Sequence, residues 1–158
     1  MKDSLTTGFS FGLTSGVITT LGLMVGLHSG THSRLIVIGG VLTIAIADAF
    51  SDALGIHISE ESENVHTEGQ IWAASIATFL SKFLFALTFV VPVLIFELGT
   101  AITVGIAWGL SMLAILSYLL AKKQGKHPRK VLAEHLLIAL VVITATHFVG
   151  HWISRMFK

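Results

Sequence analysis

The sequence predicts an all-α polytopic membrane protein with five transmembrane helices. Of its 158 residues, 53% are hydrophobic and only 12% are charged, whereas soluble domains carry roughly 25% charged residues. The mean hydropathy is +0.83. The apolar residues also fall into five runs, each long enough to cross about 30 Å of hydrocarbon. Residues 1–158 are therefore expected to form a single five-helix transmembrane domain.

Short polar segments separate the five predicted spans. The spans cover residues 8–28, 35–58, 71–94, 100–121 and 131–153. An acidic segment, 59–70, follows the second span, and a basic segment, 122–130, precedes the fifth. Pro92 lies near the end of the third span, where the helix is expected to stop or kink.

The charges of the connecting segments predict the orientation. Cytoplasmic loops are enriched in Lys and Arg, so the basic segment 122–130 is expected in the cytoplasm. Five spans then place the N-terminus and the acidic segment 59–70 on the same side and the C-terminus outside. Arg155 and Lys158 oppose this orientation, but the basic segment is the larger cluster. No cleavable signal peptide is expected, because the first apolar run opens near Gly8 without a basic lead.

Composition also excludes several classes of function. The chain has no cysteine, which excludes disulfides and thiolate metal sites. Its net charge of +1 gives no indication of nucleic-acid binding. No HExxH or paired ExxH motif is present, so we expect neither an enzyme nor a permanently bound cofactor.

Two carboxylates within the second span are the most informative feature. Asp48 and Asp52 are one helical turn apart, so they share a face. Each carboxylate costs about 2.5–3.5 kcal/mol at the centre of a bilayer, and such residues usually pair or line a water-filled cavity. Lys82 reaches a similar depth from the third span. It is expected as a charge partner of one or both aspartates, an interpretation that can coexist with a transport role.

The two aspartates continue a line of acidic residues from the cytoplasmic surface. A row of oxygen ligands suits a divalent cation such as Mg²⁺, Mn²⁺ or Fe²⁺. Protons compete for the same oxygens, which would couple metal movement to proton exchange. The predicted metal-binding residues are Asp48, Asp52, Ser15, Ser51, Glu60, Glu61, Glu63 and Glu68.

The histidines divide between the two ends of the predicted bundle. His147 and His151, four residues apart near the end of the fifth span, are candidates for an exit-side metal or proton site. The alternative is that they lie in the headgroup zone of the membrane. The four histidines on the cytoplasmic side are expected to be solvated: His57, His66, His127 and His135.

Glycines repeat every four residues in the first span. They form two sets, Gly8, Gly12 and Gly16, and then Gly22, Gly26 and Gly30. Small residues at this spacing let another helix approach closely. Packing within the chain and a dimer seam both remain open as interpretations.

The string SGVITTLGLMVGL, Ser15 to Leu27, resembles the first-helix signature of the vacuolar iron transporter family, DG-[IV]-[VI]-T-T-L-G-L. The second span is similar to that family's SMAxGEY helix, with Asp48 at the Met position and Asp52 at the Glu position. FVVPVL resembles the family's G-x-x-P-L-x-P turn, with Pro92 at the first proline. The resemblance covers nearly the whole chain. It implies a homodimer, formed through the first helix, that moves Fe²⁺ or Mn²⁺ out of the cytoplasm in exchange for protons.

The chain also departs from the family pattern. Ser15 stands where the family has an aspartate in the first helix, and Asp48 stands where it has a methionine in the second. The second change removes a soft sulfur ligand, so manganese or another hard cation stays open as the substrate in place of iron. Segment 59–70 is too short for the long Glu-rich cytoplasmic helices of the plant members. We therefore expect a short family member, in the cell membrane of a prokaryote or a vacuolar-type membrane of a eukaryote. Two alternatives are a transporter of protons or another cation and a non-transporting subunit that docks a partner through the acidic segment.

Overall fold

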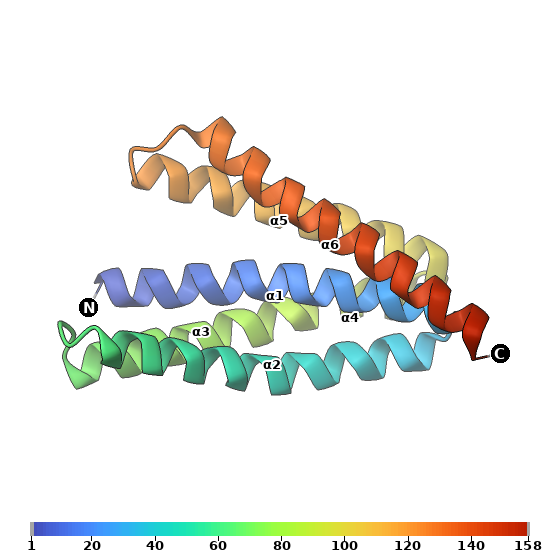
Figure 1. The fold of residues 1–158 in the computed structure, drawn as a ribbon, viewed down its shortest axis with the longest axis horizontal. Coiled ribbons are helices and arrows are strands. Elements are labelled where there is room, and N and C mark those ends of the chain that lie inside the picture. Colours follow the sequence, from blue (N-terminus) through green and yellow to red (C-terminus); the bar gives the residue numbers. More distant parts are fainter. Residues whose placement is uncertain (1, 158) are drawn as a thin grey trace.

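The computed structural model describes residues 2–157, and the side chains of residues 4–157. This part of the chain is helical apart from short connections and contains no strand (Figure 1). The helices are α1 (Lys2–Thr31), α2 (Arg34–Ser62), α3 (Glu68–Thr88), α4 (Val90–Ile95), α5 (Leu98–Lys123) and α6 (Pro128–Met156).

The helices form five candidate membrane spans, which confirms the predicted fold class. Each span is 26 to 29 residues long, and α3 and α4 together make the third, Glu68–Ile95. Pro92 causes the break between them, because it has no N–H to donate to the carbonyl of Thr88. Phe89 lies at the break, where its N–H bonds the Ala86 oxygen at 3.1 Å. By composition and length, the chain is an integral membrane protein.

The spans run alternately in opposite directions, so that the connections gather at two ends (Figure 1). The start of α1, the α2–α3 connection and the α5–α6 connection share one end, here called the basic end. Among residues 4–157, the lysines and arginines at this end are Lys122, Lys123, Lys126, Arg129 and Lys130. The opposite end holds the α1–α2 and α4–α5 turns and the end of α6. There the Arg34 guanidinium donates to the Phe96 carbonyl at 2.7 Å and ties the two turns together.

The acidic segment is more helical than the sequence predicted. Helix α2 continues through Glu60 and Glu61 to Ser62, and α3 begins at Glu68. The connection is therefore 63–67 rather than a loop over 59–70. Thr67 begins α3 with a capping box, in which its N–H donates to the Gln70 side chain at 2.8 Å. This cap satisfies a backbone donor at the start of the helix and fixes where the chain turns back.

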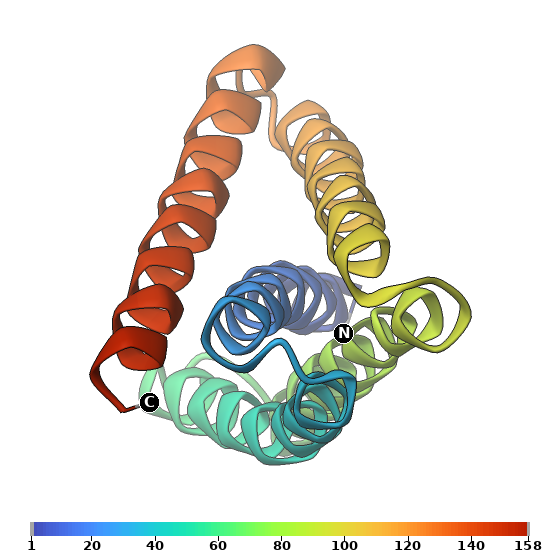
Figure 2. The ribbon, with the colours of Figure 1, turned by 90° about the vertical axis from the view of Figure 1, so that its right-hand side faces the viewer.

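Helix α1 is the central helix of the bundle (Figure 2). Half of its most apolar stretch is buried, whereas the corresponding share of α6 is 11%. Its buried apolar side chains meet those of α2, α4 and α5 in one core. The fully or nearly buried members from α1 are Leu13, Val17, Leu21, Met24 and Val25. Met24 packs within this core and is fully buried.

The two glycine sets of α1 pack against two different helices. Gly8, Gly12 and Gly16 face α3, where a side chain would meet Ala74, Thr78 and Lys82. Gly22, Gly26 and Gly30 face α6, near Val142, Thr146 and Gly150. A helix turns about 100° per residue, so the six residues from Gly16 to Gly22 set the two faces roughly 120° apart. Of the two interpretations of the repeats, the structure shows packing within the chain.

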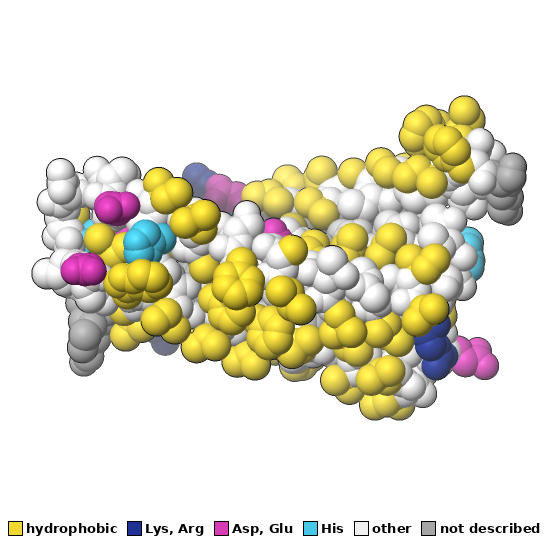
Figure 3. All heavy atoms as spheres, turned by 90° about the horizontal axis from the view of Figure 1, so that it is seen from below, with side chains coloured by type: hydrophobic (Ala, Val, Ile, Leu, Met, Phe, Trp, Pro, Cys, Tyr) yellow, Lys and Arg dark blue, Asp and Glu magenta, His cyan; other side chains and the backbone are white. Residues whose placement is uncertain are grey.

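The outer surface of the bundle is apolar in its middle. Figure 3 shows hydrophobic side chains over much of one face, with acidic and histidine side chains mainly near its two ends. Large exposed side chains include Ile46 and Phe50 of α2, Leu84 of α3 and Val141 of α6, all more than half exposed. Such a surface suits hydrocarbon rather than water, because large exposed apolar patches mark interaction or membrane surfaces.

We expect Gly12→Ala to weaken the α1–α3 contact. The added methyl group would overlap the Thr78 carbonyl and the Ser81 hydroxyl, and overpacking of this kind costs about 1–3 kcal/mol. Gly99→Ala in α5 is the matched control, because that position has open space around it. Thermal unfolding in detergent should show a lower midpoint for Gly12→Ala alone. Equal midpoints for the two variants would contradict the close packing of α1 on α3.

Candidate functional site

A buried lysine lies at the centre of the candidate site. Lys82 of α3 is 1% exposed and is among the largest fully buried side chains of the described residues. A charged ammonium within a membrane-spanning helix is costly unless opposite charges compensate it. The position of Lys82 therefore depends on the groups around its Nζ.

Helices α1 and α2 supply those groups. Together with the lysine of α3 they are here called the Lys82 cluster: Ser15, Asp48, Asp52 and Lys82. The Lys82 Nζ donates to Asp52 Oδ2 and, at 2.9 Å, to Ser15 Oγ. Asp48 Oδ2 lies 2.5 Å from the same nitrogen as an ion pair. The two aspartates thus share one face of α2, and Lys82 pairs with both of them. Close approach of α1 at Gly16, beside Lys82, brings Ser15 within reach.

The cluster carries an excess of negative charge. With all groups ionised, two carboxylates and one ammonium sum to −1. The carboxylates are also more accessible than the lysine: the side chains of Asp48 and Asp52 are 25% and 19% exposed, against 2% for Lys82. Lys82 therefore holds the carboxylates from inside the bundle while their other edges remain open.

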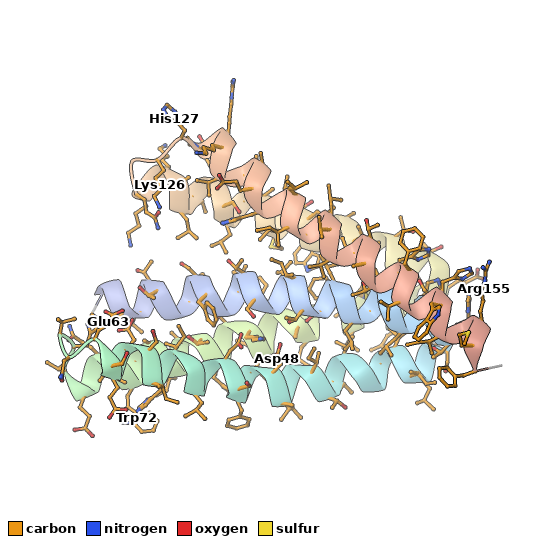
Figure 4. All side chains as sticks on the ribbon, in the orientation of Figure 1. Asp48, Glu63, Trp72, Lys126, His127 and Arg155 are labelled. Atoms are coloured by element: carbon orange, nitrogen blue, oxygen red, sulfur yellow. The ribbon has the colours of Figure 1, made fainter. Side chains whose placement is uncertain are left out.

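Asp48 faces a groove between α1 and α2. The groove has a volume of about 560 Å³ and runs from Leu27 and Ile36, near the opposite end, to Asp48 and Ser51. Figure 4 shows Asp48 near the middle of α2, on the side toward α1. Ser51 is exposed and lines the same groove, whereas Ser15 of α1 accepts a hydrogen bond from Lys82 and does not line the groove. Of the two predicted hydroxyl partners, Ser15 therefore contacts the Lys82 ammonium and Ser51 lies beside Asp48 along the groove.

A second cluster, here called the Glu60 cluster, lies at the basic end: Glu60, Glu63 and His66. His66 Nε2 is 3.4 Å from a carboxylate oxygen of Glu60 and 3.4 Å from one of Glu63. Glu60 is only 7% exposed, so it is not a solvated surface charge. Glu61 and Glu68 are exposed and do not join this cluster. Figure 4 shows Glu63 at the end of α2.

His66 is the residue that sequence reasoning missed, since it was expected to be solvated. The three-residue spacing from Glu63 to His66 was the available signal. The burial of Glu60 had no such signal, because it depends on how α2 packs. The prediction of solvation is also wrong for His57 and His135, which are partly buried and hydrogen-bonded. It holds for His127, which is exposed.

Two of these histidines make the same kind of contact between neighbouring helices. His57 Nδ1 lies 3.0 Å from Ser75 Oγ, and His135 Nδ1 lies 2.7 Å from Ser117 Oγ. Each serine hydroxyl donates its proton to a backbone carbonyl of its own helix. The imidazole must then donate from Nδ1. These histidines therefore link α2 to α3 and α5 to α6.

The histidines at the opposite end form a looser group. His147 Nδ1 lies 2.7 Å from Ser29 Oγ, which joins α6 to α1. The His147 and His151 rings are nearly parallel, with centroids 6.4 Å apart. His28 and His32 lie with centroids 5.2 Å apart at the end of α1. The predicted exit-side pair thus lies on one face of α6, and His147 is anchored by a serine.

Lys82 lies against one carboxylate oxygen, Oδ2, of each aspartate, so its ammonium would compete with a metal ion that binds both groups. Within residues 2–157, no three side chains of the metal-binding types are arranged to hold an ion. Binding of a cation at Asp48 and Asp52 would therefore require Lys82 to withdraw or to lose its proton. Asp48, Asp52 and Ser51 then offer two carboxylates and a hydroxyl, a set of hard oxygen ligands.

Comparison of the chain with family models, curated proteins and solved structures finds no match.

We expect Lys82→Met to destabilise the protein strongly. Methionine replaces the aliphatic part of the side chain but leaves two carboxylates without their partner, and breaking a buried ion pair from one side costs about 3–5 kcal/mol. Addition of Asp48→Asn and Asp52→Asn to the same chain should restore most of the loss. Chemical unfolding in detergent micelles measures both changes. If Lys82→Met alone is as stable as the natural chain, Lys82 does not neutralise the cluster.

Proposed function

We propose that the protein is a transporter that moves a divalent cation, Fe²⁺ or Mn²⁺, out of the cytoplasm in exchange for protons. The observation that carries this proposal is the Lys82 cluster: two carboxylates near the middle of a membrane span are held by one ammonium group, and one of them, Asp48, is open to a groove. Charged groups inside a membrane usually serve a pathway or a proton relay. A purely structural ion pair would need only one carboxylate per lysine.

Charge balance supports exchange rather than simple binding. With Lys82 protonated, the cluster carries −1, and a bound divalent ion would raise it to +1. If Lys82 releases its proton when the ion binds, the cluster becomes neutral. The ion and the protonated Lys82 ammonium therefore compete for the same carboxylates, which couples binding of the ion to release of a proton. Return of the proton to Lys82 would displace the ion toward the groove.

Polar groups along α2 support a route through the bundle. The Glu60 cluster stands at the basic end, which the excess of Lys and Arg assigns to the cytoplasm. Asp52 lies two turns further along α2, and Asp48 follows one turn later. The groove then continues from Asp48 to the opposite end. His147 and His151 lie at that end and would meet ions or protons leaving the groove.

The identity of the ion is proposed from ligand chemistry. The resemblance of 15–27 to the vacuolar iron transporter signature supports iron or manganese as the substrate. Asp48 stands where that family has a methionine, so the site offers oxygen ligands without a soft sulfur. Hard or borderline ions such as Mn²⁺ prefer such ligands. We therefore place Mn²⁺ beside Fe²⁺ as a substrate.

The homodimer is also a proposal, and the packing of α1 changes where it would form. Both glycine faces of α1 are occupied within the chain. An exposed stripe of small residues remains on α2, at four-residue intervals: Gly39, Thr43, Ala47, Ser51 and Gly55. It extends over about 24 Å of helix. A second copy on this stripe would shield Thr43, Ser51 and the open edge of Asp48 from lipid, and a two-fold axis would match the stripe to itself.

Transport into proteoliposomes tests the function. Asp48→Asn and Asp52→Asn should each lower uptake of Mn²⁺ and Fe²⁺ by at least about 10-fold, the loss typical of removing even an outer partner of a metal site. Glu97→Gln, an exposed carboxylate at the opposite end, should transport normally. A pH-sensitive dye in the same vesicles should report proton movement only when metal is present.

The same assay distinguishes a metal transporter from the leading alternative, a transporter of protons or another cation. The Lys82 ammonium, which two carboxylates share, favours that alternative. A proton or monovalent-cation transporter would change the dye signal without metal and would leave Mn²⁺ outside. Metal uptake that persists in both aspartate variants would contradict the proposed role of the Lys82 cluster.

Cysteine cross-linking tests the dimer, because the chain has no cysteine of its own. Ala47→Cys should form a disulfide between copies under mild oxidation, since two α2 helices packed through small residues bring their Cα atoms within the roughly 4.4–6.8 Å that a disulfide spans. Leu140→Cys, exposed on α6, should remain monomeric on a non-reducing gel. Equal cross-linking at both positions would indicate random collision rather than an interface.

A further inference from the structure

The α5–α6 connection forms a compact cationic turn at the basic end. Helix α5 ends with a Schellman motif, in which Gly125 has a φ of 66°. The Gly125 N–H bonds the Lys122 oxygen at 3.3 Å, and the Lys126 N–H bonds the Ala121 oxygen at 2.9 Å. Glycine adopts this left-handed conformation without strain. The motif holds Lys126 against the end of α5 and leads directly into α6.

A pocket of about 500 Å³ lies under this turn, between α5 and α6. Lys126 and Lys130 line it together with His135, whose Nδ1 is held by Ser117 of α5. Its other walls include Leu120 and Val131, which are apolar. Figure 4 shows Lys126 and His127 at this corner of the molecule, away from α2 and the Lys82 cluster.

The pocket carries positive charge without a compensating ion pair. Among residues 4–157, the ion pairs involve His66 and Lys82 only, so neither Lys126 nor Lys130 has a carboxylate partner. Glu134 also lines the pocket and opposes an anion, yet it lies too far from either lysine to pair. Helix α6 begins here with no side-chain cap, and the positive end of its dipole favours negative charge as well.

We propose that this pocket binds the phosphate headgroup of an anionic phospholipid. The cations would contact the phosphate, and the apolar wall of Leu120 and Val131 would contact the start of the acyl chains. The pocket is at the end of two membrane-spanning helices, where headgroups lie, and basic pockets between such helices on the cytoplasmic side suit anionic lipids. The site does not depend on the transport proposal, because it shares no residue with the Lys82 cluster.

Titration of short-chain phosphatidylglycerol into the full chain in zwitterionic detergent tests the site, with binding followed by native mass spectrometry. Lys126→Gln with Lys130→Gln should weaken binding by up to about 30-fold at low salt, since each nearby charge contributes about fivefold. The matched control is Lys122→Gln with Arg129→Gln, which removes equal charge from the same turn but outside the pocket lining. It should weaken binding by less than about threefold, since its charges are more distant and better screened.

Glu134→Gln is the second variant, and it should tighten binding because it removes the one carboxylate of the pocket lining. Phosphatidylcholine should not compete with phosphatidylglycerol. Equal weakening by the two double variants would overturn the site in favour of diffuse attraction to the turn. Inorganic phosphate that binds as tightly as the lipid would overturn the lipid as ligand, because the apolar wall would then contribute nothing. Unchanged or weaker binding in Glu134→Gln would likewise contradict the pocket.

Discussion

The attraction between one ammonium group and two carboxylates holds the middle of this bundle together. Lys82 is almost completely buried, and its partners come from α1 and α2. In hydrocarbon, charged groups must find each other or open a path to water. The remaining arrangement follows from this demand: α1 approaches α3 through glycines, α2 turns its aspartates inward, and Ser15 adds a neutral acceptor.

The number of spans, their order and the kink at Pro92 could be predicted from the sequence. A long apolar run in lipid must form a helix to satisfy its backbone hydrogen bonds, and proline removes one backbone donor. The pairing of Lys82 with the two aspartates could also be predicted, because few charged residues lie at that depth in the membrane spans. The burial of Glu60 and its contact with His66 could not be predicted. Both depend on α2 continuing one turn beyond the expected end and packing beside the α2–α3 connection.

The glycine repeats of α1 illustrate a different limit of sequence reasoning. Spacing indicates that a helix can be approached closely, but it does not say by which neighbour. The same four-residue interval occurs on α2 at Gly39, Thr43 and Ala47, where the structure leaves the face open. Only the arrangement of helices in space distinguishes a stripe used within one chain from a stripe available to another copy.

The six-residue interval between Gly16 and Gly22 has a consequence for how this chain can vary. It sets the phase between the half of α1 that contacts α3 and the half that contacts α6. Inserting or deleting a single residue there would rotate one half by about 100° relative to the other. If one of the two contacts is kept, the other could not form. Residues in this interval should therefore tolerate substitution far better than insertion or deletion.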